Sequence, residues 1–352
     1  MTRRSQLLPL RRSRRQVRSG TRPREYAKAH EAARVPIRRR LSASRAGSVT
    51  AIGQQSRAPL PLLSLPRLLK VAHPTTAAAP MWSFRAWRRR RLLARHPLDA
   101  HLWREVLDSL PILDGLSDAE LRLLGEHCVL FLHAKRLTAL PGVELDAFAR
   151  LRLAAQAQLP LLALPDLDWY QGFHELVLYP DDFVSPQKHR DPSGVEHIYE
   201  EARSGEAWHR GPVILAWPGV QDSGGWDAYN LVIHELAHKL DMLNGDANGL
   251  PPLHGDMRLA EWASTLQAAY DAMNATLDAH PHAHTPIDPY AAENPAEFFA
   301  VTSEYFFTAP DLLHDAFPEV YRQLALFYRQ DPLARLRYLQ SRHPAYQDPP
   351  SR

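Results

Sequence analysis

Apolar residues recur at helical spacing along most of the chain after residue 97, and polar residues mark where the helices begin. Ser117 and Glu120 have the spacing of a capping box and precede an apolar stripe, which predicts a helix beginning at Ser117. A second helix is expected over 144–158, from Leu145 through Leu153. Pro160 prevents it from continuing. The folded part of the chain is therefore expected to open with helices.

Two shorter apolar segments, each ended by a proline, predict strands at 173–179 and 212–217. Helical spacing then returns over three further segments, 259–273, 295–307 and 318–328. An order in which few strands are followed by many helices favours a helix-rich α+β fold with a small, mostly antiparallel sheet.

Charge divides the chain into two unlike parts. Residues 1–80 contain 18 Lys and Arg against 2 Asp and Glu, whereas the remainder contains 24 basic and 37 acidic residues, so the net charge of +3 describes neither part. The acidic balance of the folded part argues against nucleic acid as its main partner. The basic segment could still act as an arm for nucleic acid or anionic lipid.

Apolar residues show no regular spacing before residue 81, which suggests that the chain is divided near this position. We expect 1–80 to be a disordered basic extension outside the working protein, with Met81 as the true start. Residues 81–96 would then form a short basic leader, 97–340 one folded domain and 341–352 a tail.

Cysteine use and hydropathy indicate the compartment. Cys128 is the only cysteine, so no disulfide can form within the chain, as is typical of reducing compartments. The sequence has no run of about 18 apolar residues of the kind that a membrane span requires. Arginines interrupt the place where an export signal would need its apolar stretch. We expect a cytoplasmic protein without a membrane partner.

The segment 231–241 contains the pattern His-Glu-x-x-His, at His234, Glu235 and His238, within an apolar helix that Asn230 could cap. Residues four apart share one helix face, so both imidazoles can reach one Zn²⁺ while a third ligand comes from elsewhere. Glu235 would lie beside the ion and could take a proton from a water that the ion activates. The pattern therefore predicts a zinc-dependent peptidase acting on a peptide substrate.

The third ligand is less certain from spacing alone. The further His and the Gly of a metzincin are absent, because Asp241 and Asn244 occupy those positions. A downstream glutamate is the common alternative. The candidates are Glu261, Glu293, Glu297 and Glu304.

Two of these positions have further interpretations. Asn294 and Pro295 predict a helix start, for which Glu297 could be a ligand or simply a capping-box carboxylate. Glu304 lies on the same face of that helix and could hydrogen bond to a ligand or be exposed. Asp241, one turn after His238, could accept the free imidazole N–H of a ligand or end the helix as a turn residue.

Several stretches together resemble the Mlc titration factor A family of bacterial zinc peptidases. The resemblance covers roughly 97–340. The matching stretches are Gly172–Glu175, Gly211–Leu215, Asn230–Asp241, Asn244–Asp246, Tyr290–Ala292, Pro295–Val301 and Ser303–Phe307.

This resemblance implies roles that spacing alone leaves open. It implies His234, His238 and Glu297 as zinc ligands, Glu235 as the base and Tyr290 as the active-site tyrosine. It also implies aminopeptidase activity, binding to a glucose-responsive transcription repressor, and a zincin-like fold similar to the catalytic domain of anthrax lethal factor. The domain over 97–340 is then expected to be the metallopeptidase domain.

Overall fold

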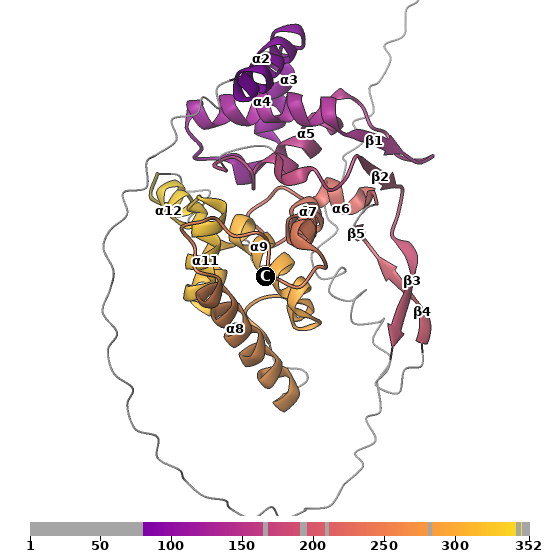
Figure 1. The fold of residues 1–352 in the computed structure, drawn as a ribbon, viewed down its shortest axis with the longest axis vertical. Helices are drawn as coiled ribbons and strands as arrows, with labels where there is room; N and C mark the ends of the chain where they lie inside the picture. Colours follow the sequence, from indigo (N-terminus) through magenta and orange to yellow (C-terminus); the bar gives the residue numbers. More distant parts are fainter. Residues whose placement is uncertain are drawn as a thin grey trace, which may run out of the picture. The chain divides into compact units, whose positions relative to one another are not determined.

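The structure, a computed structural model, is shown in Figure 1. It describes residues 80–164, 168–190, 196–207, 211–280, 284–342 and 346. The predicted extension over 1–80 lies outside the described residues except for Pro80, and so does most of the predicted tail. The description below concerns the compact unit formed by the described part of the chain.

Four short strands form a mixed sheet in the order β1-β2-β6-β5. The strands are β1 (Arg136–Ala139), β2 (Glu175–Tyr179), β5 (Gly205–Ala207) and β6 (Val213–Ala216). The pairs β1–β2 and β2–β6 are parallel, and only the edge strand β5 runs antiparallel to its neighbour β6. The prediction of a mostly antiparallel sheet was therefore wrong for this sheet.

The connections explain the parallel order. Parallel neighbours need a long crossover, and helix α5 (Ala147–Gln158) lies between β1 and β2 in the chain. Between β2 and β6 the chain forms a separate antiparallel hairpin of β3 (Phe183–Arg190) and β4 (Glu196–Arg203), which extends away from the helices in Figure 1. An apolar pattern identifies a strand, but it does not fix the direction of the neighbouring strand.

Helices make up most of the described chain, and the predicted helix-rich α+β class is confirmed. The remaining α-helices are α2 (Pro80–Arg95), α3 (Ala100–Asp108), α4 (Asp118–Ala134), α6 (Trp217–Asp222), α7 (Leu231–Asp241), α8 (Leu259–Ala279), α9 (Pro295–Thr308), α10 (Pro310–Ala316), α11 (Pro318–Tyr328) and α12 (Pro332–Arg342). Short 3-10 helices are η1 (Pro111–Leu113), η2 (Asp168–Tyr170), η3 (Met242–Asn244) and η4 (Pro289–Ala292). Of the described helices, none combines the length and the apolar composition needed to cross a bilayer.

Local capping explains where several helices begin. The backbone N–H of Glu120 donates to Ser117 Oγ at 3.3 Å, and that of Ser117 donates to Glu120 Oε2 at 2.8 Å, so the predicted capping box at the start of α4 is confirmed. Asn230 and Asn294 cap α7 and α9 with their side-chain oxygens, which accept backbone N–H groups of the first turn, as predicted.

Helix α7 lies in the core between the sheet and α9 (Figure 1). All of its residues are buried, including the apolar side chains expected to anchor it. Aromatic side chains of α8, α9 and α11 form a cluster in the core. Its pairs are mostly edge to face or tilted, the arrangements that aromatic pairs prefer. Its members are Trp262, Phe299, Phe306, Phe307, Phe327 and Tyr328. Helices α7 and α9 are thus both packed inside the core.

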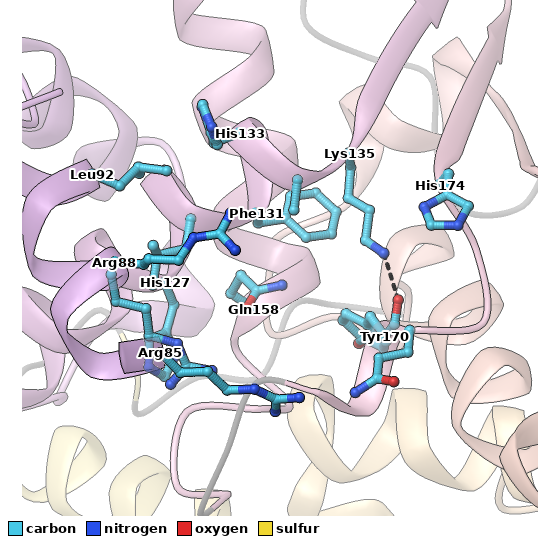
Figure 2. A pocket seen from close by; sticks show the side chains of 14 residues that line it. Arg85, Arg88, Leu92, His127, Phe131, His133, Lys135, Gln158, Tyr170 and His174 are labelled. Atoms are coloured by element: carbon cyan, nitrogen blue, oxygen red, sulfur yellow. Dashed lines mark hydrogen bonds between the residues drawn. The ribbon is translucent and has the colours of Figure 1, made fainter. Parts of the chain in front are cut away.

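A cavity of about 580 Å³ lies among α2, α4 and the segment around η2 (Figure 2). The basic helix α2, at the position of the predicted leader 81–96, packs on α4 and forms one wall of this cavity.

Candidate metal centre

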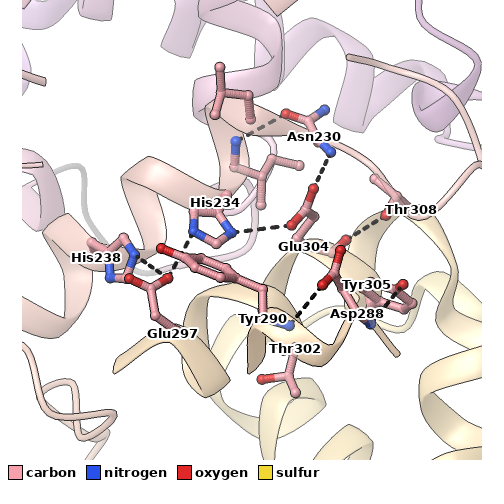
Figure 3. A network of polar contacts seen from close by, with 12 residues as sticks. Asn230, His234, His238, Asp288, Tyr290, Glu297, Thr302, Glu304, Tyr305 and Thr308 are labelled. Carbon is pink, nitrogen blue, oxygen red and sulfur yellow. Dashed lines mark hydrogen bonds and ion pairs between the residues drawn. The ribbon is translucent and has the colours of Figure 1, made fainter. Parts of the chain in front are cut away.

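The two histidines of the His-Glu-x-x-His pattern lie on successive turns of α7 (Figure 3). Their ring centroids are 5.1 Å apart. Asn230 fixes the start of the helix, because its Oδ1 accepts a hydrogen bond from the N–H of Ile233 at 3.0 Å. His234 and His238 therefore present their rings together on the face of α7 that meets α9.

Glu297 on α9 lies between these two rings. Its Oε2 is 3.2 Å from Nε2 of His234 and 3.2 Å from Nε2 of His238. Asn294 positions it, since its Oδ1 accepts hydrogen bonds from the backbone N–H groups of Ala296 and Glu297 at 2.9 and 3.0 Å. The three side chains offer ligand atoms that all lie within 4.8 Å of one another.

The electrostatics of this cluster match a cation site. Burial alone would lower the pKa of His234, but its hydrogen bonds to Glu297 and Glu304 raise it well above the ordinary value. Burial would raise the pKa of Glu297, but the neighbouring His238 and His234 hold it well below its usual range. A buried carboxylate between two imidazoles thus requires positive charge at this point. Two imidazole nitrogens and one carboxylate oxygen are also a donor set that fits a divalent metal ion.

Glu304, two turns after Glu297 on α9, fixes the orientation of one imidazole. Its Oε2 lies 3.2 Å from Nδ1 of His234, and its Oε1 accepts the backbone N–H of Asn230 at 2.6 Å. A carboxylate on the second ring nitrogen is the usual means of orienting a metal-binding histidine and fixing its tautomer. Of the two interpretations open for Glu304, the structure places it in contact with the site rather than exposed.

Glu235 is buried on α7 and faces the edge strand β5. A Cβ added at Gly205 of β5 would lie 2.2 Å from Glu235 Oε1, so only glycine allows this close approach. Burial would lower the pKa of His238, but the charge of Glu297 and, to a smaller extent, that of Glu235 raise it. The carboxylate of the expected base therefore lies beside both the metal cluster and the sheet edge.

Tyr290 comes from η4, the turn that precedes α9. Its ring centroid is 6.2 Å from that of His234, and its hydroxyl points to the side where Glu297 and His238 lie in Figure 3. Asp288 holds this turn in place: its Oδ1 accepts the N–H of Tyr290 at 2.8 Å, and its own N–H donates to the hydroxyl of Tyr305 on α9 at 3.1 Å. The tyrosine expected from the resemblance is thus brought to the cluster.

Asp241 anchors the turn that follows α7. Its Oδ2 accepts the backbone N–H groups of Asn248 and Gly249 at 2.7 Å each, which corresponds to the turn-residue interpretation. Burial raises its pKa, while these bonds and the nearby His238 oppose the rise, so a role in orienting that ring stays a prediction. Gly249 has φ +79°, and a Cβ there would lie 2.6 Å from the carbonyl oxygen of Pro295 at the start of α9.

The other two glutamate candidates lie elsewhere. Glu261 on α8 forms a salt bridge with Arg322 at 2.6 Å, and Glu293 is an exposed residue at the end of η4. The structure therefore brings together His234, Glu235, His238, Tyr290, Glu297 and Glu304.

Comparison with known proteins identifies the family. The family model of the glucose-regulated metallo-peptidase M90 matches residues 84–329, a range that includes the whole cluster. The chain belongs to this family. The resemblance found in the sequence is therefore confirmed, and membership of a metallopeptidase family agrees with the metal-binding geometry of α7 and α9.

Individual relatives are similar to this chain over a comparable length. Mlc titration factor A of Cronobacter sakazakii is 42% identical over 251 residues, which are 71% of this chain and 93% of the relative. Mlc titration factor A of Yersinia enterocolitica is 44% identical over 237 residues, 67% of this chain and 87% of the relative. That of Salmonella arizonae is 44% identical over 239 residues, 67% of this chain and 93% of the relative.

Sequence reasoning missed Gly205, which lies against the carboxylate of Glu235. Its strand β5 has three residues, too few for an apolar alternation to be visible. A glycine flanked by polar residues gives a signal only once the packing partner is known.

Proposed function

We propose that this metallopeptidase-family member is a zinc-dependent peptidase in which His234, His238 and Glu297 hold the ion. The observation that carries the proposal is the convergence of two buried imidazoles and one carboxylate from two core helices. Catalytic zinc sites have three protein ligands of this kind and one open position, and two His with one carboxylate on a peptidase scaffold favour zinc. When bound, Zn²⁺ acts as a Lewis acid that polarises a carbonyl and lowers the pKa of water in the site.

The side chains around the cluster have complementary tasks in this proposal. Glu235 takes a proton from the attacking water and passes it to the leaving amine, a role supported by its position beside His238 and the sheet edge. Tyr290 donates its hydroxyl to the oxyanion of the tetrahedral intermediate, and loss of one such donor costs about 3–4 kcal/mol. Glu304 keeps Nε2 of His234 directed at Glu297.

We propose short peptides as substrates and cleavage at the amino end, which the family resemblance supports. A free peptide and its N-acetylated form, assayed side by side, test this: an aminopeptidase cleaves only the free form. Equal cleavage of both would instead indicate an endopeptidase.

The one cysteine, Cys128, is buried and free, which agrees with a protein working in the cytoplasm.

The sharpest test of the mechanism is Glu235→Gln, which keeps the side-chain shape and removes the base. We expect peptide hydrolysis to fall by at least about a hundredfold, since general-base catalysis contributes about 10²–10⁴-fold, while zinc content by mass spectrometry stays stoichiometric. Glu293→Gln is the matched control, because that glutamate is exposed and outside the cluster. A full rate in the zinc-loaded Glu235→Gln protein would contradict the mechanism.

A regulatory role is the second candidate, and the name of the relatives favours it. These relatives are Mlc titration factors, so we propose as an alternative that this chain binds a transcription repressor of glucose uptake independently of turnover. Under this alternative, Glu235→Gln retains repressor binding in a pull-down while hydrolysis is lost. Absence of repressor binding in the active wild type would eliminate the alternative.

A further inference from the structure

The cavity among α2, α4 and η2 differs from the metal centre in its lining (Figure 2). Its volume of about 580 Å³ lies in the range of cavities that bind small molecules. Of the described residues that line it, none is acidic, and half are basic or imidazole side chains. These are Arg85, Arg88, Arg89, His127, His133, Lys135 and His174.

Two buried polar groups of the lining have no hydrogen-bond partner among the described residues. They are Nδ1 of His127 and the hydroxyl of Tyr170, whose residues are 8% and 3% exposed. Both atoms are shielded from solvent, and a buried polar atom without a partner is destabilising, so the wall of the cavity contains unsatisfied polar groups. Burial, together with the charge of Arg89, lowers the pKa of His127 to about 4, so the ring is neutral and can donate one N–H.

Lys135 adds a fixed positive charge to the same wall. Its Nζ donates to the carbonyl oxygens of Tyr170 and Phe173 at 2.5 Å each. An ammonium group has three N–H donors, so one remains for a ligand. Burial lowers the pKa of Lys135 to about 8, a shift that an anion in the cavity would reverse.

Helix α2 supplies the arginines from one side of the cavity. Arg85, Arg88 and Arg89 are three and four residues apart, so they share one face of the helix. Arg88 and Arg89 form no salt bridge with a carboxylate within the described part of the chain. Guanidinium groups match the geometry of phosphate oxygens and bind them through paired hydrogen bonds.

We propose that this cavity is a binding site for a small organic phosphate, separate from the metal centre. The lining consists mainly of hydrogen-bond donors, and a phosphate group offers only acceptors and negative charge. Leu92, Leu130 and Phe131 provide an apolar wall for the organic part of the ligand. The site does not depend on the proposed peptidase activity, because none of its lining residues belongs to the cluster on α7 and α9.

The test is isothermal titration calorimetry of the full chain with inorganic phosphate and with glycerol 3-phosphate. We expect saturable binding of both, with a Kd of about 1 mM or lower, and tighter binding of the organic phosphate. Glycerol alone should not bind. Arg89→Gln should weaken binding by about tenfold or more, whereas Arg90→Gln, an exposed arginine on the same helix that does not line the cavity, should leave it unchanged.

A variant of the metal centre separates the two sites. His238→Ala should bind both probes as the wild type does, because the cavity contains no residue of α7. Loss of binding in His238→Ala would place the phosphate at the metal centre and overturn the proposal. Equal weakening by Arg89→Gln and Arg90→Gln would indicate diffuse charge attraction instead of a site, and absence of saturable binding up to about 10 mM of either probe would also overturn it.

Discussion

The metal centre and the basic cavity both contain buried polar side chains, but they balance charge in opposite ways. In the metal centre, one carboxylate oxygen of Glu297 contacts both imidazoles, and Glu304 contacts one of them from behind. In the cavity, Lys135 contacts backbone carbonyls, and arginines and histidines complete the wall.

The pKa shifts show the consequence of this difference. Burial lowers the pKa of His127 and Lys135 in the cavity, because no carboxylate opposes it. The same burial acts on His234, yet hydrogen bonds to two glutamates raise its pKa. A site that supplies its own counter-charges is suited to hold a cation in fixed geometry, whereas a site that lacks them is suited to receive an anion.

Removing the shared carboxylate should have the largest effect. In Glu297→Ala the two imidazoles lose their common partner and the cluster loses one of its three candidate ligands. We expect loss of bound zinc, measured by mass spectrometry, and a fall in peptide hydrolysis of more than about a thousandfold. Glu293→Ala, four residues earlier and exposed, should change neither; full zinc content in Glu297→Ala would show that this residue is not a ligand.

Displacing Glu235, the proposed base, without changing the three candidate ligands should have the next largest effect. The Cβ of Gly205→Ala would collide with Glu235 Oε1, so the carboxylate must move. We expect kcat to fall by about a hundredfold, the cost of a misplacement of about 1 Å, with zinc content unchanged. Gly172→Ala is the matched control, since a Cβ there meets nothing within 4 Å. An unchanged kcat in Gly205→Ala would mean that the carboxylate tolerates displacement.

Weakening the orienting carboxylate should have a smaller effect. Glu304→Gln keeps an acceptor for Asn230 and removes the negative charge next to His234. We expect zinc affinity, measured by competition with a chelator, to fall by about 10–100-fold. Glu319→Gln on the exposed face of α11 serves as the control. Unaltered affinity would show that Glu304 supports packing only.

Replacing a histidine of the cavity should have the smallest effect, a change in how the stability of the fold depends on pH. The pKa of His127 is lower in the folded protein than its ordinary value, so its contribution to stability is present above pH 6.5 and decreases as the pH falls towards 4. We expect the drop in Tm between pH 7 and pH 5 to be smaller by a few degrees in His127→Gln than in the wild type. The exposed His101→Gln should match the wild type, and an unchanged drop in His127→Gln would argue against a neutral, buried ring.

Features set by neighbours in sequence could be predicted from the sequence. Ser117, Asn230 and Asn294 were predicted as caps because a cap bonds to residues two or three positions ahead. Glu297 and Glu304 were placed on one face of a single helix because seven residues are about two turns. Residue spacing could not distinguish Glu297 from Glu261 as the third metal ligand, since that choice depends on which helix packs against α7.

Features set by packing between distant segments could not be predicted. The contact of helix α2 with α4 could not be predicted, because a run of arginines shows no apolar stripe that would mark the packing face. The direction of β2 beside β1 depends on the path of α5, which no residue of either strand encodes. Gly205 acquires its importance only through contact with Glu235, 30 positions along the chain.

Gly249 has a consequence for how α7 and α9, the helices that carry the candidate ligands, are joined. His238 and Glu297 are 59 residues apart in the chain. Gly249 is tied back to Asp241 at the end of α7 and lies against the backbone of Pro295 at the beginning of α9. This close approach, together with the direct packing of α7 on α9, sets the separation of the candidate ligands without the help of the intervening chain. A change in the length of the loop between α8 and η4 should therefore leave the positions of the three donor atoms unchanged.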